Sequence, residues 1–173
     1  SNENESEGSD RSFEMPFKQN ELVKKISEAN PNTIVVLNSG GNVEMASWID
    51  GVKGLLHAWY PGGEGALAVA EIIFGVTNPS GKLPVSFESK LEDNPTFNSY
   101  WDDDNDLNVD FTEGIFVGYR HYDKSAVKAR YPFGFGLSYS TFEMKNAKVS
   151  ALQIKSGQGV EVLVDVTNTG NYD

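Results

Sequence analysis

The sequence predicts an α/β fold with a mostly parallel sheet, followed by an all-β segment. The first observation is TIVVL at residues 33–37, a continuously apolar and β-branched run that is typical of a strand buried on both faces. The second is a strand–helix–strand pattern over residues 54–87, the unit from which parallel sheets are built. The third is VEVLVDV at residues 160–166, whose alternation indicates a strand with one apolar face.

Length, charge and composition narrow the function classes. With 173 residues, the chain can form one domain and part of another, and it can bury a real core. A net charge of −11 argues against nucleic acid and against an anionic membrane surface, because both require a basic face. The absence of cysteine excludes disulfides, thiolate catalysis and cysteine-bound zinc, and it leaves the compartment undecided. No apolar run approaches the roughly 20 residues that span a bilayer.

The N-terminal part begins without a strand. Residues 1–12 are polar and acidic, which by composition alone indicates a frayed, solvated chain end. A helix is expected over residues 17–29, because Leu22, Val23 and Ile26 form a narrow apolar stripe.

A glycine-rich turn, Asn38 to Gly41, follows the strand at residues 33–37. It contains neither GxGxxG nor GxxxxGK[ST], so we interpret it as a tight turn before a short helix near residues 43–49, and not as a phosphate site. The second strand is expected over residues 52–59. His57 lies inside it, where a position in the core or at its rim is more common than a catalytic role.

The turn from Tyr60 to Gly65 is expected at the functional edge of the sheet, because ligands bind beyond the carboxyl ends of parallel strands. Residues 66–74 predict a helix buried on most faces, and residues 82–87 predict another strand. Glu64 stands at the start of the helix, where the helix dipole favours a carboxylate. We interpret Glu64 as a capping residue, with a place in the lining of a ligand site as the alternative.

Residues 88–113 form a long irregular stretch, which indicates a loop that has a function or packs on a partner. Its acidic run at 101–106 does not have the spacing of an EF-hand, so a solvated loop is preferred over a calcium site. Residues 115–122 predict a strand with aromatic side chains on both faces and with His121 exposed. Residues 131–139 predict a structural segment that crosses the domain, where glycines permit sharp bends between packed rings.

From Thr141 onward the pattern is that of an all-β domain. Residues 143–149 and 160–166 are strand candidates, and in isolation they would leave an open apolar face and unpaired edges. Because the chain opens in polar, loop-like residues and closes just after a strand candidate, we expect a fragment of a longer protein.

Three blocks of sequence carry a family resemblance. They are NESEGSDR at residues 4–11, AWYPGGEG at 58–65 with FGVTNPSGKLPVSF at 74–87, and EGIFVGYRHYD at 113–123 with YPFGFGLSYSTF at 131–142. Together they resemble the C-terminal α/β domain of glycoside hydrolase family 3, the β-glucosidase-like enzymes. They cover nearly the whole chain in the family's order.

The resemblance implies three parts of the chain. Residues 1–15 would carry the acid/base loop, and residues 16–140 would form a three-layer α/β sandwich that lacks its first strands. Residues 141–173 would begin a fibronectin type III-like β domain. The nucleophile in family 3 is an aspartate on a (β/α)8 barrel N-terminal to this region, and a chain of this length has no room for that barrel.

The resemblance also implies a catalytic residue. In many family members the general acid/base is a glutamate on a loop of the α/β domain, and the matching position in NESEGSDR is Glu7, with Glu5 as the runner-up. Gly8 would allow the turn, and Asp10 and Arg11 could pair and hold the loop. The chain departs from the family at the residue after Gly8, a serine where an aromatic residue is usual, so the packing of the loop can differ.

The function implied is that of a fragment of a retaining, exo-acting β-glycosidase that releases terminal β-linked sugars from glucosides or oligosaccharides. The fragment would be inactive alone, because the barrel of the same parent chain holds the other half of the carboxylate pair. No cofactor, metal, nucleic acid or membrane partner is expected. The alternative is a non-catalytic module that binds saccharide or joins domains.

Overall fold

The computed structural model describes residues 11–102 and 106–172, and it divides the chain into two compact units. The first contains Ser1–Val69 and Lys82–Phe135, and the second contains Ala70–Gly81 and Gly136–Asp173. The described elements are, in chain order, α1 (Gln19–Ala29), β1 (Ile34–Leu37), the 3-10 helix η2 (Ile49–Gly51), β2 (Gly54–His57), α2 (Gly65–Ile73), the 3-10 helix η3 (Leu91–Asp93), α3 (Tyr119–Lys124), β3 (Phe142–Val149) and β4 (Val162–Asn168). The expected α/β class is confirmed. No helix within the described ranges is long and apolar enough to cross a membrane.

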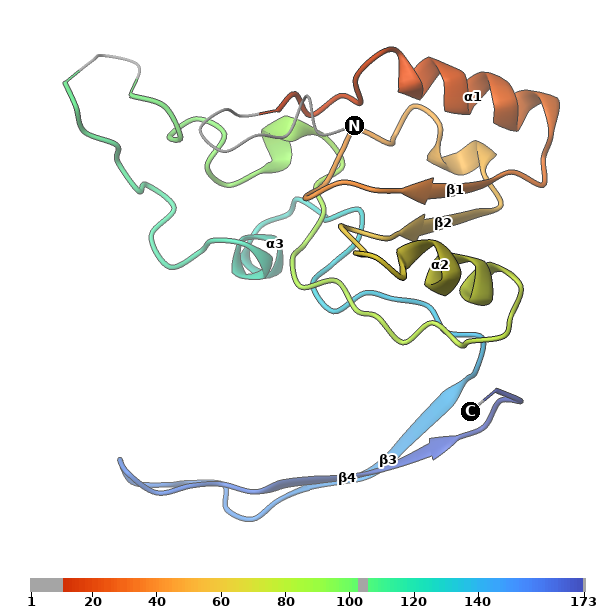
Figure 1. Cartoon of the computed structure of the whole chain (residues 1–173). Helices are drawn as coiled ribbons and strands as arrows, with labels where there is room; N and C mark the ends of the chain where they lie inside the picture. Colours follow the sequence, from red (N-terminus) through yellow and green to blue (C-terminus); the bar gives the residue numbers. More distant parts are fainter. Residues whose placement is uncertain (1–10, 103–105, 173) are drawn as a thin grey trace. The chain divides into compact units, whose positions relative to one another are not determined.

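The parallel sheet consists of β1 and β2, which lie side by side in Figure 1 and pair in register from Ile34 with Gly54 to Leu37 with His57. The expectation that β1 is buried on both faces is wrong, since Ile34 is 49% exposed and Val36 is 39% exposed. A sheet of two strands offers too little neighbouring surface to cover both faces of either strand.

Both long helices predicted from the sequence are present. The helix expected over residues 17–29 starts two residues later, after Lys18, which adopts a positive φ of 59°. The helix expected over residues 66–74 is α2, but its expected burial is wrong: Leu67 at the start of α2 is 57% exposed. An apolar composition predicted the helix correctly, and it did not fix how much of the helix surface is covered.

The strand expected over residues 82–87 is not formed. Pro84 has no N–H to donate to a sheet ladder, and only Phe87 makes an isolated antiparallel bridge, with Tyr131. The Phe87 N–H donates to the Tyr131 carbonyl at 2.8 Å. Residues 82–87 therefore pair irregularly with the segment 131–135, and not with a parallel strand.

The short helix expected near residues 43–49 is replaced by a turn and by η2. These residues instead supply side chains to the core of the first unit. The core consists of Met15, Leu37, Val43, Met45, Trp48 and Phe87. The most deeply buried of them is Met45, which is 1% exposed.

The strand expected over residues 115–122 is also wrong. Gly118 adopts a positive φ of 59° and precedes the helix α3, and the His121 N–H donates to the Gly118 carbonyl at 3.1 Å. Tyr122 on α3 is buried at 8% exposure. The backbone therefore turns at Gly118, and aromatic residues that fit a strand in the sequence lie on a short helix.

β3 and β4 form an antiparallel hairpin, so both strand candidates near the C-terminus are confirmed. The second strand begins two residues later than expected and extends to Asn168. The ladder runs from Phe142 paired with Asn168 to Val149 paired with Val162, and its register shifts between Lys145 and Lys148. Every residue of both strands is exposed.

Candidate functional site

The carboxyl ends of the parallel strands lead into two loops. The loop after β1 spans residues 38–42, and the turn after β2 spans residues 58–65. Glu7, Glu5 and Asp10 lie outside the described residues. The described chain begins at Arg11, four residues after Glu7, and its first contact is with the loop after β1.

Arg11 fastens the start of the described chain to that loop. Its Nη2 donates to the backbone carbonyl of Asn42, and its Nη1 donates to the Ser12 carbonyl at 3.2 Å. A cationic donor makes this hydrogen bond stronger than a neutral one. Arg11 therefore holds the chain at the last residue of the NESEGSDR block.

Two further contacts hold residues 11–15. The Glu44 N–H donates to the Phe13 carbonyl at 2.8 Å, and Met15 is buried in the core beside Met45. The segment is thus fixed by a charged side chain, a backbone hydrogen bond and an apolar anchor.

The glycines of the loop after β1 allow close packing. A Cβ on Gly40 would lie 2.8 Å from the Tyr60 hydroxyl, and a Cβ on Gly41 would lie 2.9 Å from Arg11 Nη2. Both distances are shorter than real Cβ contacts, so a larger residue would displace its neighbour. The glycine-rich turn therefore lets Arg11 and Tyr60 approach the backbone.

Asn42 connects the same loop to Glu88. Its Nδ2 donates both to the Glu88 carbonyl and to Glu88 Oε2, each at 3.0 Å, and its Oδ1 accepts the Val43 N–H at 2.9 Å.

The charge of Glu88 also acts on Tyr122. Burial is the main cause that raises the pKa of Tyr122 to about 12, and the negative charges of Glu88 and Asp93 add to it.

His57 lies under this loop. Its ring is half-buried, with Nε2 3.4 Å from the Gly41 carbonyl oxygen. The ring centroid is 4.4 Å from that of Trp59 and 5.3 Å from that of Phe87. These contacts agree with the interpretation of His57 as a packed residue at the rim of the core.

The turn after β2 presents aromatic and acidic side chains. Trp59 adopts a positive φ of 51°, which is rare for an aromatic residue, and Tyr60 is 63% exposed. Glu64 is exposed directly before α2, and its backbone carbonyl accepts the Ala68 N–H at 3.0 Å. The Glu64 carboxylate therefore stands near the helix N-terminus and remains accessible to solvent.

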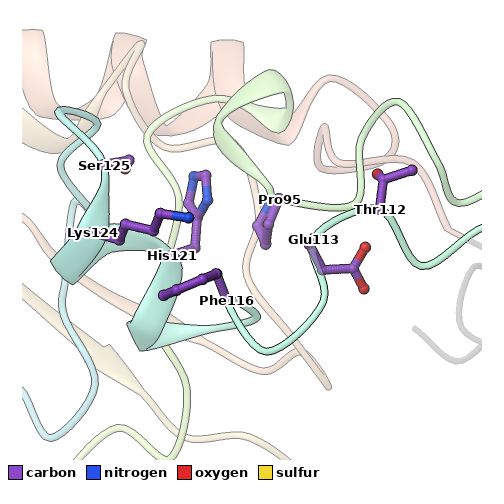
Figure 2. A pocket seen from close by; sticks show the side chains of 7 residues that line it. All are labelled: Pro95, Thr112, Glu113, Phe116, His121, Lys124 and Ser125. Atoms are coloured by element: carbon purple, nitrogen blue, oxygen red, sulfur yellow. The ribbon is translucent and has the colours of Figure 1, made fainter.

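A second feature is an open hollow of about 400 Å³ beside α3 (Figure 2). Its lining residues are Pro95, Thr112, Glu113, Phe116, His121, Lys124 and Ser125. Within the ranges that the structure describes, Glu113 Oε2 and Ser125 Oγ are buried without a hydrogen-bond partner, and Lys124 Nζ lies 3.5 Å from the Phe116 ring centroid.

The hollow was not predicted, because the sequence was interpreted as a strand at this point. His121, which was expected to be exposed on that strand, is half-buried on α3 and lines the hollow. The residues that the structure describes contain no group of three or more His, Cys, Asp or Glu that could hold a metal ion.

Comparison with known proteins assigns the family. The family model described as "Glycosyl hydrolase family 3 C-terminal domain" matches residues 1–139. Beta-glucosidase B of Emericella nidulans is 46% identical over 179 residues, which cover 96% of this chain and 21% of that protein. An exo-alpha-(1->6)-L-arabinopyranosidase of Bifidobacterium longum is 40% identical over 171 residues, 98% of this chain and 22% of that protein.

A solved structure agrees with the family model and with these two relatives. The crystal structure of a glycoside hydrolase family 3 beta-glucosidase from Bifidobacterium adolescentis has a TM-score of 0.85 and is 40% identical, over 95% of this chain and 24% of that chain. This chain spans about a fifth of the length of the curated relatives it matches. From the match over residues 1–139 and these similarities, the chain belongs to glycosyl hydrolase family 3 and corresponds to its C-terminal domain.

Proposed function

We propose that the full-length protein carrying this chain is a retaining, exo-acting β-glycosidase of the β-glucosidase type, and that Glu7 is its general acid/base. The observation that carries the proposal is the block NESEGSDR, in which a glutamate precedes glycine. This block resembles the segment that carries the acid/base glutamate in many members of the family. An aspartate on the N-terminal barrel would be the nucleophile.

The reaction would proceed in two displacements. In the first, Glu7 gives a proton to the glycosidic oxygen while the aspartate attacks the anomeric carbon, so the aglycone leaves as an alcohol and a glycosyl ester forms. In the second, the Glu7 carboxylate takes a proton from water, and the water oxygen displaces the aspartate. Both carboxyl groups return to their starting states, and the sugar keeps its anomeric configuration.

The anchoring of residues 11–15 supports this role. A glutamate that serves a sugar bound on another domain must lie on a segment that extends from its own domain and has a fixed base. Four residues extend at most about 14 Å, so the contact between Arg11 and Asn42 limits the reach of the acid/base candidate.

A β-linked glucoside is the substrate favoured by the names of the relatives, most of which are beta-glucosidases. The relative from Bifidobacterium longum is named for an arabinopyranoside and matches this chain at 40% identity. Since C-terminal segments of such similar sequence accompany different sugar specificities, we assign the choice of sugar to the rest of the protein.

The experiment is a comparison of Glu7→Gln with wild type in the full-length protein, on phenyl and dinitrophenyl β-glucosides. The oxygen of the phenyl group must be protonated for phenol to leave, whereas dinitrophenolate leaves without a proton. We expect kcat/KM on the phenyl glucoside to fall by about 10²–10⁴-fold, the usual contribution of general acid catalysis, with a much smaller fall on the dinitrophenyl glucoside. Equal kcat/KM values for mutant and wild type on the phenyl glucoside would refute the proposal, and an effect seen with Glu5→Gln instead would move the assignment to Glu5.

A further inference from the structure

Asn42 occupies the position between the anchor of residues 11–15 and the acidic side chain of Glu88. Its backbone carbonyl accepts from Arg11, and its side-chain amide donates to the carbonyl and to the carboxylate of Glu88. We infer that Asn42 and Glu88 are positioning residues, which hold the acid/base segment through Arg11. The inference rests on the proposed role of Glu7 and adds two residues to that site.

The side chain of Asn42 fixes the direction in which its own carbonyl points. Oδ1 accepts the Val43 N–H at 2.9 Å, and Nδ2 makes two bonds of 3.0 Å to Glu88. With both ends of the amide engaged, rotation of the Asn42 side chain and of its peptide group is restricted. The carbonyl that receives the Arg11 guanidinium is therefore held in one orientation.

Glu88 is a rigid base for this contact. It follows Phe87, which is 2% exposed in the core and bridges Tyr131. Its carboxylate gives a charge-assisted bond, roughly twice as strong as a neutral one. The groups run from a cation at Arg11, through the amide groups of Asn42, to an anion at Glu88. Each hydrogen bond therefore polarises the next group and strengthens the next hydrogen bond.

The contacts join parts of the chain that are distant in sequence. Arg11 and Asn42 are separated by 31 positions, and Asn42 and Glu88 by 46. Loss of the side-chain amide of Asn42 would leave the hydrogen bond from Arg11 to the Asn42 backbone carbonyl in place, but this carbonyl could then move. Since a displacement of 1 Å can cost about 10²-fold in rate, partial loosening should cost about 10-fold in the step that needs the acid.

The test uses the full-length protein and the same two substrates. Asn42→Ala and Glu88→Ala should each lower kcat/KM on phenyl β-glucoside by about 10-fold, with little change on dinitrophenyl β-glucoside. The double variant should be no worse than either single variant, because residues that act as one unit are not additive. The matched controls are Asn98→Ala and Glu92→Ala, which remove the same side-chain types from exposed positions.

A reversed pair tests the contact between Asn42 and Glu88 directly. Asn42→Asp removes the donor and places a second carboxylate against Glu88, so it should lower kcat/KM on phenyl β-glucoside at least as much as Asn42→Ala. Adding Glu88→Gln supplies a donor from the other side, and we expect it to restore most of the lost kcat/KM. The second substrate separates positioning from folding, because a variant that fails to fold loses kcat/KM on both glucosides to the same extent.

Two results would overturn the inference. One is Asn42→Ala behaving like Asn98→Ala on both substrates, and the other is a loss of kcat/KM in Asn42→Ala that is equal on both substrates. Glu7→Gln in the same assay separates the two proposals. If it discriminates between the substrates and Asn42→Ala does not, only the positioning role fails; if it does not discriminate, the proposed function itself fails.

Discussion

The core around Met45 and the hairpin β3–β4 contain similar apolar side chains and bury them to opposite extents. Met45 is 1% exposed and Phe87 is 2% exposed, whereas Met144 is 72% exposed and Val162 is 68% exposed. The core draws largely on turns and irregular segments, and the hairpin has a nearly continuous ladder.

The difference teaches that regular pairing and close packing are separate properties of this chain. The hairpin obtains its register from period-two alternation and backbone hydrogen bonds, but two strands alone cannot cover an apolar face. The core obtains its closure from segments that are distant in sequence and mostly irregular. Substitutions should therefore be costly in the core and mild in the hairpin.

The largest expected effect comes from a pair of methionines. Met45→Ala should lower the free energy of unfolding of the 173-residue chain by about 2–5 kcal/mol, because it removes a fully buried side chain and leaves a cavity. Met144→Ala should change it by less than about 0.5 kcal/mol, as for other surface positions. Urea unfolding of both variants, with a probe of the core, measures the contrast, and equal losses would contradict it.

A smaller effect is expected at the turn after β2. A Cβ on Gly65 would lie 2.5 Å from Cγ of Pro61, a rigid ring, whereas a Cβ on Gly63 would have no neighbour within 4 Å. Gly65→Ala should therefore lower the free energy of unfolding by about 1–3 kcal/mol through overpacking. Gly63→Ala is the control and should be neutral within about 0.5 kcal/mol. A neutral Gly65→Ala would mean that the turn can relax.

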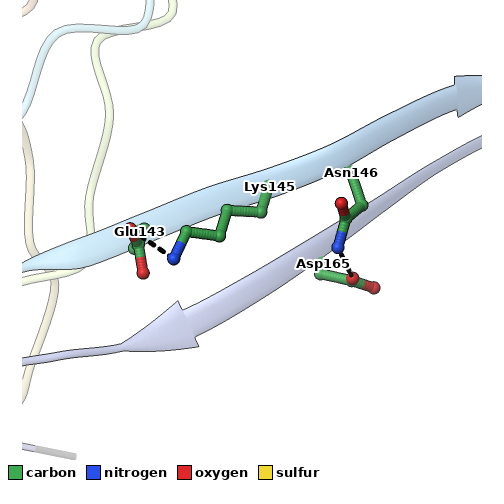
Figure 3. A network of polar contacts seen from close by, with 4 residues as sticks. All are labelled: Glu143, Lys145, Asn146 and Asp165. Carbon is green, nitrogen blue, oxygen red and sulfur yellow. Dashed lines mark hydrogen bonds and ion pairs between the residues drawn. The ribbon is translucent and has the colours of Figure 1, made fainter.

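In the hairpin, the sensitive position is the bulge. Asn146 adopts a positive φ of 55° there and donates to Asp165 Oδ2 at 2.8 Å (Figure 3). Asn146→Ala should cost about 1 kcal/mol in hairpin stability, because alanine disfavours this backbone conformation and lacks the donor. Asn146→Gly should recover part of the loss. Lys145→Ala breaks only an exposed ion pair with Glu143 and should cost less than about 0.5 kcal/mol. Amide hydrogen exchange in β3 and β4 measures the stability of the hairpin in these variants. If the amides of Asn146→Gly are no more protected than those of Asn146→Ala, the positive φ at this position does not contribute to the loss.

The smallest expected effect is that of Tyr122 titration on stability, which is absent at neutral pH. Its pKa is raised from 10.0 to about 12, so the folded state holds the phenol proton more tightly than the unfolded chain. The stability from this group is complete below pH 10.0 and is lost as the pH rises toward about 12. The difference in tyrosinate absorbance between wild type and Tyr122→Phe should give this titration, and Glu88→Gln should lower the pKa without restoring 10.0, since burial is the larger cause. A midpoint near 10.0 in wild type would contradict the structure.

The sequence predicted elements whose signals are local. The helices α1 and α2, the strands of the hairpin and the two short strands β1 and β2 follow from apolar periodicity and composition. The parallel unit expected over residues 54–87 was wrong, and the parallel pair observed is β1 with β2. The strand expected at residues 82–87 was wrong because Pro84 and the pairing of Phe87 with Tyr131 outweigh strand composition. The strand expected at residues 115–122 was wrong because of a turn at Gly118 that no local pattern required.

The candidate site likewise has one part that the sequence indicated and another part that it could not indicate. Glu7 was identified only through the family's motif, since by composition it is a surface carboxylate near a chain end. The contacts of Asn42 with Arg11 and Glu88 could not be predicted, because they span 31 and 46 residues and depend on how the core closes. The glycines beside Arg11 and Tyr60 were interpreted as a tight turn before a short helix. The backbone bends there, but the expected helix does not follow, and the packing partners of these glycines lie in other segments.

The central claim is that this chain supplies the general acid/base of a retaining glycosidase through Glu7. The most direct measurement is the product formed by Glu7→Ala in the full-length protein with dinitrophenyl β-glucoside, with and without azide. Azide needs no base in order to attack the glycosyl ester, and it can enter the space vacated by the carboxylate. We predict slow turnover that azide accelerates, with a β-glucosyl azide of retained configuration. Turnover at the wild-type rate with no azide product would contradict the claim.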